Sequence, residues 1–133
     1  MTHGFALAAG IQAPEEVLAP LRAYVAGHAT GDAVHIAAAF LPTAHVEGYR
    51  EGSFVSWTLE TYGGLFGGSP AADEAGRTRT LDQLTVTGEV ATATMSLVHG
   101  PDTFTDAFVL VYDPELGWRI VNKVYERRAP AAR

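Results

Sequence analysis

The chain of 133 residues is long enough for one domain with a core of its own. Hydrophobic residues make up 47% of it and charged residues 18%, a composition typical of globular proteins and unlike that of disordered ones. The net charge of −6 argues against nucleic acid and anionic membranes as partners, because both attract basic surfaces.

Cysteine is absent from the sequence, which excludes disulfides, thiolate metal sites and cysteine nucleophiles. No apolar run approaches the roughly 20 residues that a membrane span requires. Residues 1–10 lack the basic start of a signal peptide. We therefore expect a soluble cytoplasmic protein whose residues 1–13 form a loosely held arm, residues 14–128 a single domain and residues 129–133 a tail.

Three helices are predicted in the first half of the domain. Pro14 and the acidic residues after it begin the first helix, and Gly27 is expected to end it. Asp32 caps a second helix over residues 33–40. After two short strands, a third helix is expected over residues 56–66.

From residue 77 the helical spacing of apolar residues gives way to alternation, which predicts strands. Short connections rich in turn residues make neighbouring strands antiparallel. With the two earlier strands, this order predicts an α+β fold in which three N-terminal helices pack on a curved, mostly antiparallel sheet of about six strands. The four later strands are expected over residues 77–87, 89–99, 103–112 and 118–126.

Alternation also predicts which face of the sheet is buried, because the more apolar face should meet the helices. That face carries Ala91, Ala93, Met95, Leu97, Phe104, Asp106, Phe108, Leu110, Tyr112, Trp118, Ile120, Asn122 and Val124. The opposite face is rich in threonine and valine and poor in charge, and we expect it to form a homodimer interface. The alternative is that threonine simply suits exposed strands.

Four segments carry a family resemblance. They are Gly31-Asp32 before a short helix, residues 40–44 leading into the first strand, residues 104–106, and residues 117–125 in the closing strand. Together with the order of elements they resemble the NTF2-like superfamily, most closely its bacterial putative lumazine-binding or SnoaL-like branch. This resemblance implies a cone-shaped domain, usually dimeric, with a cavity between the concave sheet face and the helices. The superfamily contains isomerases, dehydratases, cyclases and binding proteins, so the fold alone does not define a function.

Asp106 and Asn122 are the main candidate site residues, because both fall on the apolar face. A buried carboxylate is costly unless it is hydrogen-bonded, shifted in pKa or in contact with a cavity. If Tyr112 pairs with Trp118, the register makes Asp106 and Asn122 a diagonal pair about 7–8 Å apart on the cavity floor. The alternative is a structural pair whose members bond to each other or to helix ends.

Further candidates for ligand binding are aromatic. Trp57 is preferred to Tyr62, because on one helix the two would point to opposite sides. Tyr24 is placed like the oxyanion-hole tyrosine of ketosteroid isomerases, although the acid motif of those enzymes is absent, and core packing is the alternative. The remaining candidates lie on the inner face or at the end of a strand: Phe108, Trp118 and His99.

Other polar residues are assigned to the surface. Lys123, the only lysine, is expected on the outer face, and His28 and His35 are expected to be solvated. His45 and Glu47 alternate on one strand, but no third ligand follows at a suitable spacing, so no metal site is expected. Glycine-rich nucleotide motifs and hydrolase motifs are absent from the sequence, and we expect no cofactor.

Three functions remain open. The first is binding of a small, partly apolar molecule in the cone by a protein without strong catalysis. The second is cofactor-free proton transfer by a SnoaL-like or ketosteroid-isomerase-like enzyme with Asp106 as acid and base. The third is a dimerisation module whose cavity is filled by side chains, so the volume of the cavity separates it from the other two.

Overall fold

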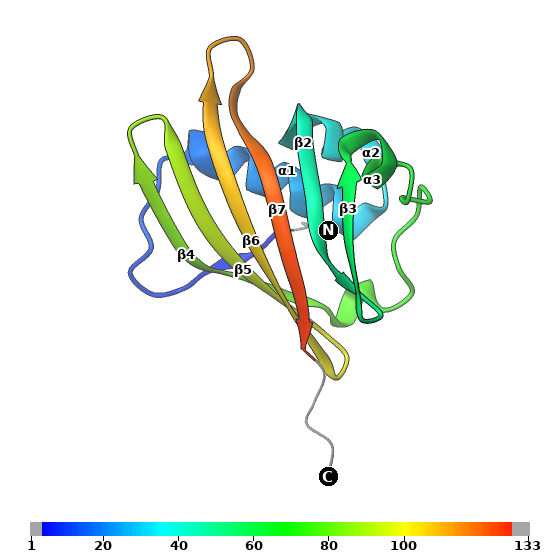
Figure 1. Ribbon diagram of the computed structural model, residues 1–133. Coiled ribbons are helices and arrows are strands. Elements are labelled where there is room, and N and C mark those ends of the chain that lie inside the picture. Colours follow the sequence, from blue (N-terminus) through cyan, green and yellow to red (C-terminus); the bar gives the residue numbers. More distant parts are fainter. Residues whose placement is uncertain (1–3, 129–133) are drawn as a thin grey trace.

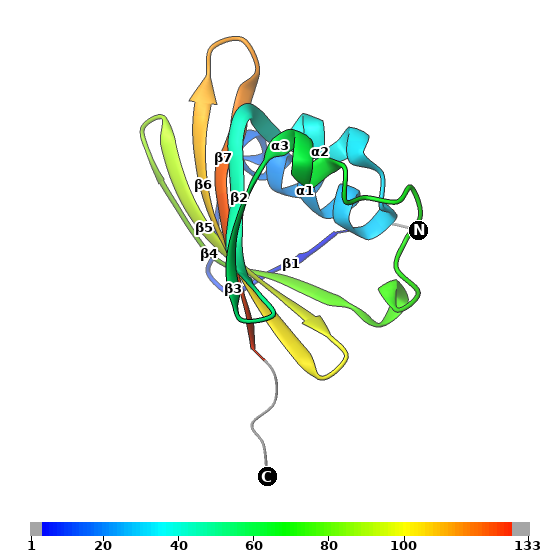
Figure 2. The ribbon, with the colours of Figure 1, turned by 45° about the vertical axis from the view of Figure 1, so that its right-hand side comes forward.

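The computed structural model describes residues 4–128 as helices packed against one strongly curved sheet (Figure 1). The helices α1 (Glu15–Thr30), α2 (Ala33–Ala39) and α3 (Leu59–Gly63) lie on the concave side of this sheet (Figure 2). The predicted α+β class with three N-terminal helices is therefore confirmed. None of the described helices is long and apolar enough to cross a membrane.

The sheet has seven strands: β1 (Ala6–Leu7), β2 (Phe40–Arg50), β3 (Ser53–Thr58), β4 (Thr78–Thr87), β5 (Val90–His99), β6 (Asp102–Asp113) and β7 (Gly117–Arg128). Their order is β1-β4-β5-β6-β7-β2-β3. The pairs β1–β4 and β2–β7 are parallel, and the other neighbours are antiparallel. The seventh strand is β1, which belongs to the segment expected to form a loose arm and pairs with Thr80 and Leu81.

The sequence predicts that α1 ends at Gly27, but the helix continues to Thr30. The helix is capped by Gly31, whose φ of 76° lies in the left-handed region that glycine adopts without strain. Gly27 instead marks the contact between α1 and α2, because a Cβ atom there would lie 2.7 Å from Cδ1 of Ile36. A glycine in a helix can thus signal close packing as well as an end.

The second helix begins as predicted, with the Asp32 carboxylate accepting a hydrogen bond from the Val34 amide at 3.0 Å. The predicted third helix over residues 56–66 is wrong in its first part, because β3 continues to Thr58 and only then does α3 begin. The Thr58 hydroxyl caps α3 by accepting from the Thr61 amide at 3.2 Å. Trp57 is therefore a strand residue.

Strand β7 contains a bulge that the predicted register lacks. Leu110 pairs with Ile120, as predicted, but the preceding residue Val109 pairs with Asn122. Val121 is the additional residue, and beyond it the side chains alternate in the opposite sense. The sheet faces predicted for the second half of β7 are therefore wrong.

Strand β2, which pairs with β7, is irregular opposite this bulge. Its pairing with β7 jumps from Phe40–Ile120 to His45–Asn122, so four residues of β2 face a single residue of β7. One of the four is Pro42, which has no N–H group to donate to the sheet. The bulge turns Lys123 toward the concave side, and Asp106 pairs with Tyr125 instead of Val124.

The faces predicted for β5 and for most of β6 are confirmed, because their inner residues are buried: Ala91, Ala93, Met95, Leu97, Asp106, Phe108 and Leu110. Trp118 is 7% exposed and belongs to this core. The convex face of the sheet carries valines that are 40–50% exposed: Val90, Val98, Val109 and Val124. This row of exposed apolar residues matches the predicted composition of the outer face.

Candidate functional site

A cavity of about 710 Å³ lies between the concave face of the sheet and the helical layer. Its walls come from α1, from α3, from five of the strands and from residues 65–71, whose Gly68 amide donates to the carbonyl of Gly31 at the end of α1. This volume is within the range of small-molecule sites. The alternative of a cavity filled by side chains is therefore wrong.

Four buried polar side chains meet at the inner end of the cavity. Lys123 Nζ donates to the hydroxyl of Tyr24 at 2.7 Å and to that of Tyr62 at 3.3 Å. The Tyr24 hydroxyl donates in turn to Oδ2 of Asp106 at 3.2 Å, and Nζ of Lys123 lies 3.9 Å from Oδ1. A chain of donors therefore runs from an ammonium group through a phenol to a carboxyl group.

Aromatic rings surround the Lys123 ammonium group. Its Nζ lies 4.6 Å from the ring centroid of Tyr24 and 5.3 Å from those of Tyr62 and Tyr125. The negative faces of these rings favour a cation in a position that is largely shielded from water. The expectation that Lys123 lies on the outer face is wrong, since its side chain is only 7% exposed.

The electrostatics of the cluster are set mainly by burial. Burial raises the pKa of Asp106 above 3.8, although Lys123 and the hydrogen bond from Tyr24 oppose it. Burial alone would lower the pKa of Lys123, but Asp106 and Tyr62 raise it above 10.5. Burial and Asp106 also raise the pKa of Tyr24 well above 10.0. The cluster thus combines a fixed cation, a neutral phenol and a carboxyl group with increased proton affinity.

An aromatic wall lines one side of the cavity. Trp57 on β3 and Tyr125 on β7 stack with their ring centroids 6.4 Å apart and their planes 16° from parallel. Gly48 on β2 lies between them, and a Cβ atom there would be 2.8 Å from the Tyr125 ring. Trp57 also stacks on Tyr62, at 6.1 Å and 29°. Trp57 and Tyr62 both line the cavity, so the expectation that only one of them faces it is wrong.

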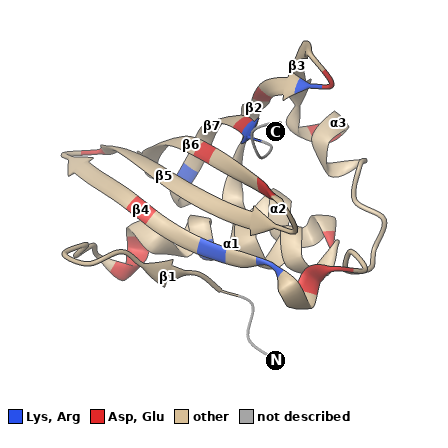
Figure 3. Cartoon of the chain, turned by 90° about the horizontal axis from the view of Figure 1, so that it is seen from below, with Lys and Arg blue, Asp and Glu red and all other residues tan. Residues whose placement is uncertain are grey.

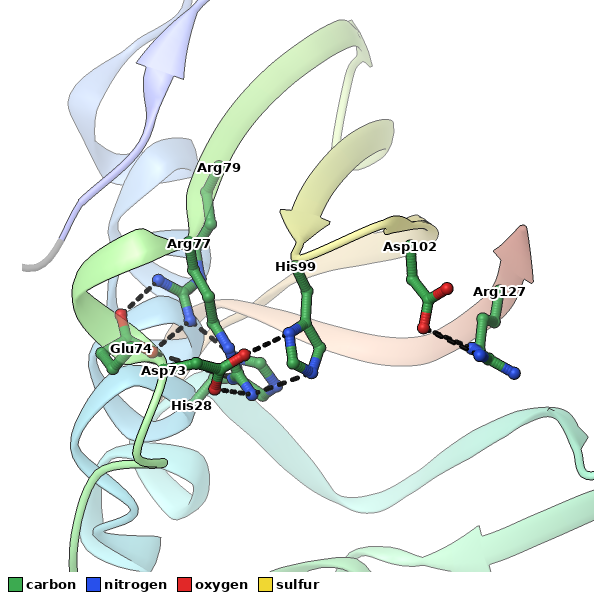
Figure 4. A network of polar contacts seen from close by, with 8 residues as sticks. All are labelled: His28, Asp73, Glu74, Arg77, Arg79, His99, Asp102 and Arg127. Carbon is green, nitrogen blue, oxygen red and sulfur yellow. Dashed lines mark hydrogen bonds and ion pairs between the residues drawn. The ribbon is translucent and has the colours of Figure 1, made fainter. Parts of the chain in front are cut away.

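His28 connects the cavity with a buried ion pair below it (Figure 4). Arg79 donates to Glu74 at 2.7 Å and to Nδ1 of His28 at 2.9 Å, which places the imidazole proton on Nε2. Burial, followed by the charges of Lys123 and Arg79, lowers the pKa of His28 from 6.5 to about 3. The expectation of a solvated His28 is therefore wrong, and its ring is neutral at physiological pH.

A second set of contacts in Figure 4 holds the segment before β4 against the end of β5. Arg77 pairs with Asp73 at 3.1 Å and approaches Nε2 of His99 at 3.3 Å. Asp73 also contacts Nδ1 of His99. The imidazole of His99 stacks on Phe104 at 6.1 Å, and both rings line the cavity.

Two arginines and the acidic residue Glu51 line the outer end of the cavity. Arg50 lies at the end of β2, with its guanidinium carbon 5.8 Å from the ring centroid of Trp57. Arg127 near the end of β7 pairs with Asp102 at 2.8 Å. Viewed from below, basic segments are visible on β4, on β7 and at the β2–β3 hairpin (Figure 3).

The cavity is lined by the predicted site residues Asp106, Tyr24, Trp57 and His99. Phe108 and Trp118 do not line it and belong to the core. The ring of Phe108 packs edge-on against Tyr24 at 5.3 Å, so Phe108 supports the site from behind.

Asn122 is not on the cavity floor, because the bulge turns its side chain to the other face of the sheet. Its amide donates to the Glu47 carboxylate at 2.9 Å and to the His45 carbonyl at 3.1 Å. Glu47 also accepts from Ser56 at 2.8 Å. His45 and Glu47 therefore face away from the cavity, and no group of three or more metal-ligating side chains occurs within residues 4–128.

Among the lining residues that the sequence does not predict, Lys123, Tyr125 and Arg50 were missed for identifiable reasons. Lys123 and Tyr125 were placed outside because alternation was continued through the bulge, and Pro42 in the paired strand was the available signal. Arg50 follows the inward-facing residues Val46 and Gly48 at intervals of two and could have been found by extending the predicted strand pattern.

Comparison with known proteins supports the fold. The model of a protein family described as "Putative lumazine-binding" matches residues 12–126. No curated protein matches the chain.

Several solved structures share the architecture. An NTF2-like protein of unknown function from Silicibacter pomeroyi DSS-3 is 22% identical, with a TM-score of 0.74 over 86% of this chain and 94% of that chain. Another of unknown function, from Methylobacillus flagellatus KT, is 22% identical, with a TM-score of 0.74 over 95% and 100% of the two chains. A putative ketosteroid isomerase from Shewanella frigidimarina NCIMB 400 is 13% identical, with a TM-score of 0.61 over 91% and 99%. These similarities show an NTF2-like fold, as the sequence resemblance implied.

Proposed function

The chain belongs to the NTF2-like family described as putative lumazine-binding, and we propose that it binds a small, flat, partly apolar ring compound in its cone. The observation that carries this proposal is the aromatic wall of Trp57, Tyr125 and Tyr62, which ends at the charged Lys123 inside a cavity of about 710 Å³. Stacked rings offer a flat apolar surface that suits another flat ring.

The polar cluster suits a heteroaromatic ring with carbonyl and N–H groups on one edge. A carbonyl oxygen would accept from the Lys123 ammonium group, and a ring N–H would donate to the Asp106 carboxylate. Lumazine, the compound in the family description, has both kinds of group on a flat bicyclic ring. It is therefore the first compound to test.

Isothermal titration calorimetry with lumazine tests the proposal. Trp57→Leu removes the stacking surface and should weaken binding about tenfold, because aromatic contacts contribute roughly 0.5–1.5 kcal/mol beyond their buried area. Phe54→Leu is the matched control, since Phe54 lies on the same strand but is 58% exposed and does not line the cavity. Equal affinities of the two variants, or no saturable binding of lumazine or related flat rings, would contradict the proposal.

A second candidate function is proton transfer by Asp106, which its raised pKa favours. The Tyr24 phenol and the Lys123 ammonium group beside it would stabilise negative charge on a substrate oxygen. An enolisable ring ketone such as 2-tetralone in D₂O provides the test, with hydrogen exchange followed by NMR. Hydrogen exchange of the ketone that is faster than in buffer, and lost in Asp106→Asn, would support catalysis. Exchange at the buffer rate would contradict catalysis and leave ligand binding as the proposed function.

We further propose that the protein forms a homodimer through the convex face of its sheet. The exposed valines of β5, β6 and β7 support this proposal, because they leave an apolar surface facing water. A second copy related by a two-fold axis would cover both surfaces with the same residues.

A further inference from the structure

Among the described residues, Arg50 differs from the other cations of the cavity in having no acidic partner. The other three pair with carboxylates of the chain at 3.9, 3.1 and 2.8 Å, respectively: Lys123 with Asp106, Arg77 with Asp73, and Arg127 with Asp102. Within residues 4–128, Arg50 makes no ion pair. Arg50 therefore brings uncompensated positive charge to the cavity of a chain with a net charge of −6.

The position of Arg50 is fixed by a tight hairpin. The residue continues the inward-facing row of Val46 and Gly48 and immediately precedes the turn at Glu51 and Gly52. Both turn residues have positive φ, 52° and 83°, which is the geometry of the two-residue turns that match the twist of a hairpin. The strand thus directs the Arg50 side chain to the cavity side.

The guanidinium group lies at the outer end of the aromatic wall. Its central carbon is 5.8 Å from the ring centroid of Trp57. It is also close to Tyr125, whose pKa is raised by burial while Arg50 opposes that increase. A ring stacked on Trp57 and Tyr125 would therefore bring a substituent on its outer edge next to Arg50.

We propose that the compound bound in the cone carries a carboxylate on its outer edge and that Arg50 binds this carboxylate. The inference rests on the proposed function and adds the charge and orientation of the ligand. A guanidinium group offers paired donors that match the two oxygens of a carboxylate. At the inner end, a carboxylate bound to Lys123 would lie beside the carboxylate of Asp106, which repels it. The anionic end therefore points outward and the neutral polar edge inward.

Two matched pairs of probes test the proposal: lumazine with lumazine-6-carboxylate, and 2-naphthamide with 2-naphthoate. Wild-type protein should bind each acid about tenfold more tightly than its neutral partner, and the preference should decrease with salt. Arg50→Gln should abolish the preference, so that each acid binds about as tightly as its neutral partner. Arg128→Gln is the control, because it removes the same charge from an exposed residue that pairs with Glu126 and does not line the cavity.

The outcomes separate this inference from the proposed function. If neutral and acidic probes bind equally well, or if Arg50→Gln retains the preference for acids, the proposed role of Arg50 is wrong. The proposal that the cone binds a flat ring is then unaffected. If no probe of either pair binds to the wild-type protein, the proposed function fails and this inference fails with it.

Discussion

Asp106 and Lys123 face each other at the inner end of the cavity, with 3.9 Å between Oδ1 and Nζ, because β7 bulges at Val121. Without the additional residue, regular alternation would turn Lys123 outward and leave the buried Asp106 without a cation. A bulge therefore determines the charge of the site.

Removal of Lys123 should destabilise the protein in a pH-dependent way. Lys123→Met leaves a buried carboxylate unpaired, and we expect the free energy of unfolding to fall by about 3–5 kcal/mol at pH 8. The loss should be smaller at pH 5. An acid whose folded-state pKa is raised is most favourable to folding at low pH, and this contribution is lost as the pH rises through the folded-state pKa. Urea unfolding at the two pH values measures the difference.

The control removes both charges. In the double variant with Asp106→Asn and Lys123→Met, no ionised group is left unpaired in the cluster, so much of the stability at pH 8 should return. If the single Lys123→Met variant is as stable as the double variant at pH 8, the unpaired Asp106 carboxylate does not destabilise the folded state, and the expectation is wrong.

Gly48 should be needed for the aromatic wall. A Cβ atom at this position would lie 2.5 Å from the Tyr125 carbonyl oxygen and 2.8 Å from its ring, so Gly48→Ala should cost about 1–3 kcal/mol through overpacking. The near-ultraviolet circular dichroism of the stacked Trp57 should change as well. Gly63→Ala is the control, because nothing lies within 4 Å of a Cβ atom there. Equal melting temperatures of the two variants would contradict the close packing of Gly48 against Tyr125.

The sequence predicts the α+β class and the inner faces of β5 and β6, because alternation is not interrupted through Met95 and Phe108. It fails at β7, because a bulge inverts the faces without changing the composition of the strand. Pro42 in the paired strand β2 is the local sign of this irregularity, because it has no N–H group to donate to the sheet. Trp57 was assigned to a helix because a short apolar segment does not distinguish the two periods.

The polar contacts of the site were beyond sequence reasoning for another reason. Arg79 and His28 are 51 positions apart, and Lys123 and Tyr24 are 99 apart. Contacts at such separations depend on the position of whole helices against the sheet, which periodicity does not provide. The sequence therefore indicates Asp106 and Tyr24 separately, but not their connection through Lys123.

His28 should make folding sensitive to acid. Its folded-state pKa of about 3 lies below the ordinary value of 6.5, so the unfolded chain takes up a proton that the folded chain excludes. The stability from the neutral ring is present above pH 6.5 and is lost as the pH falls toward 3, with about 2 kcal/mol lost between pH 7 and pH 5. His28→Gln, whose side-chain oxygen can still accept from Arg79, should lack this part of the pH dependence. If the free energies of unfolding of the wild type and of His28→Gln fall in parallel as the pH decreases, His28 does not contribute to the acid sensitivity.

The proposed dimer should depend on the convex valines. A specific interface covers about 800 Å² on each partner, and the exposed valines at positions 90, 98, 109 and 124 extend over three neighbouring strands. Light scattering at micromolar concentration should give about twice the chain mass of 14.1 kDa. Val109→Arg places an unpaired charge in this surface and should give a monomer, because a buried charge without a partner is costly. Val34→Arg, at a position 70% exposed on α2, should leave the dimer intact. A wild-type protein that is monomeric under these conditions, or a Val109→Arg variant that remains dimeric, would show that this face of the sheet is simply solvated.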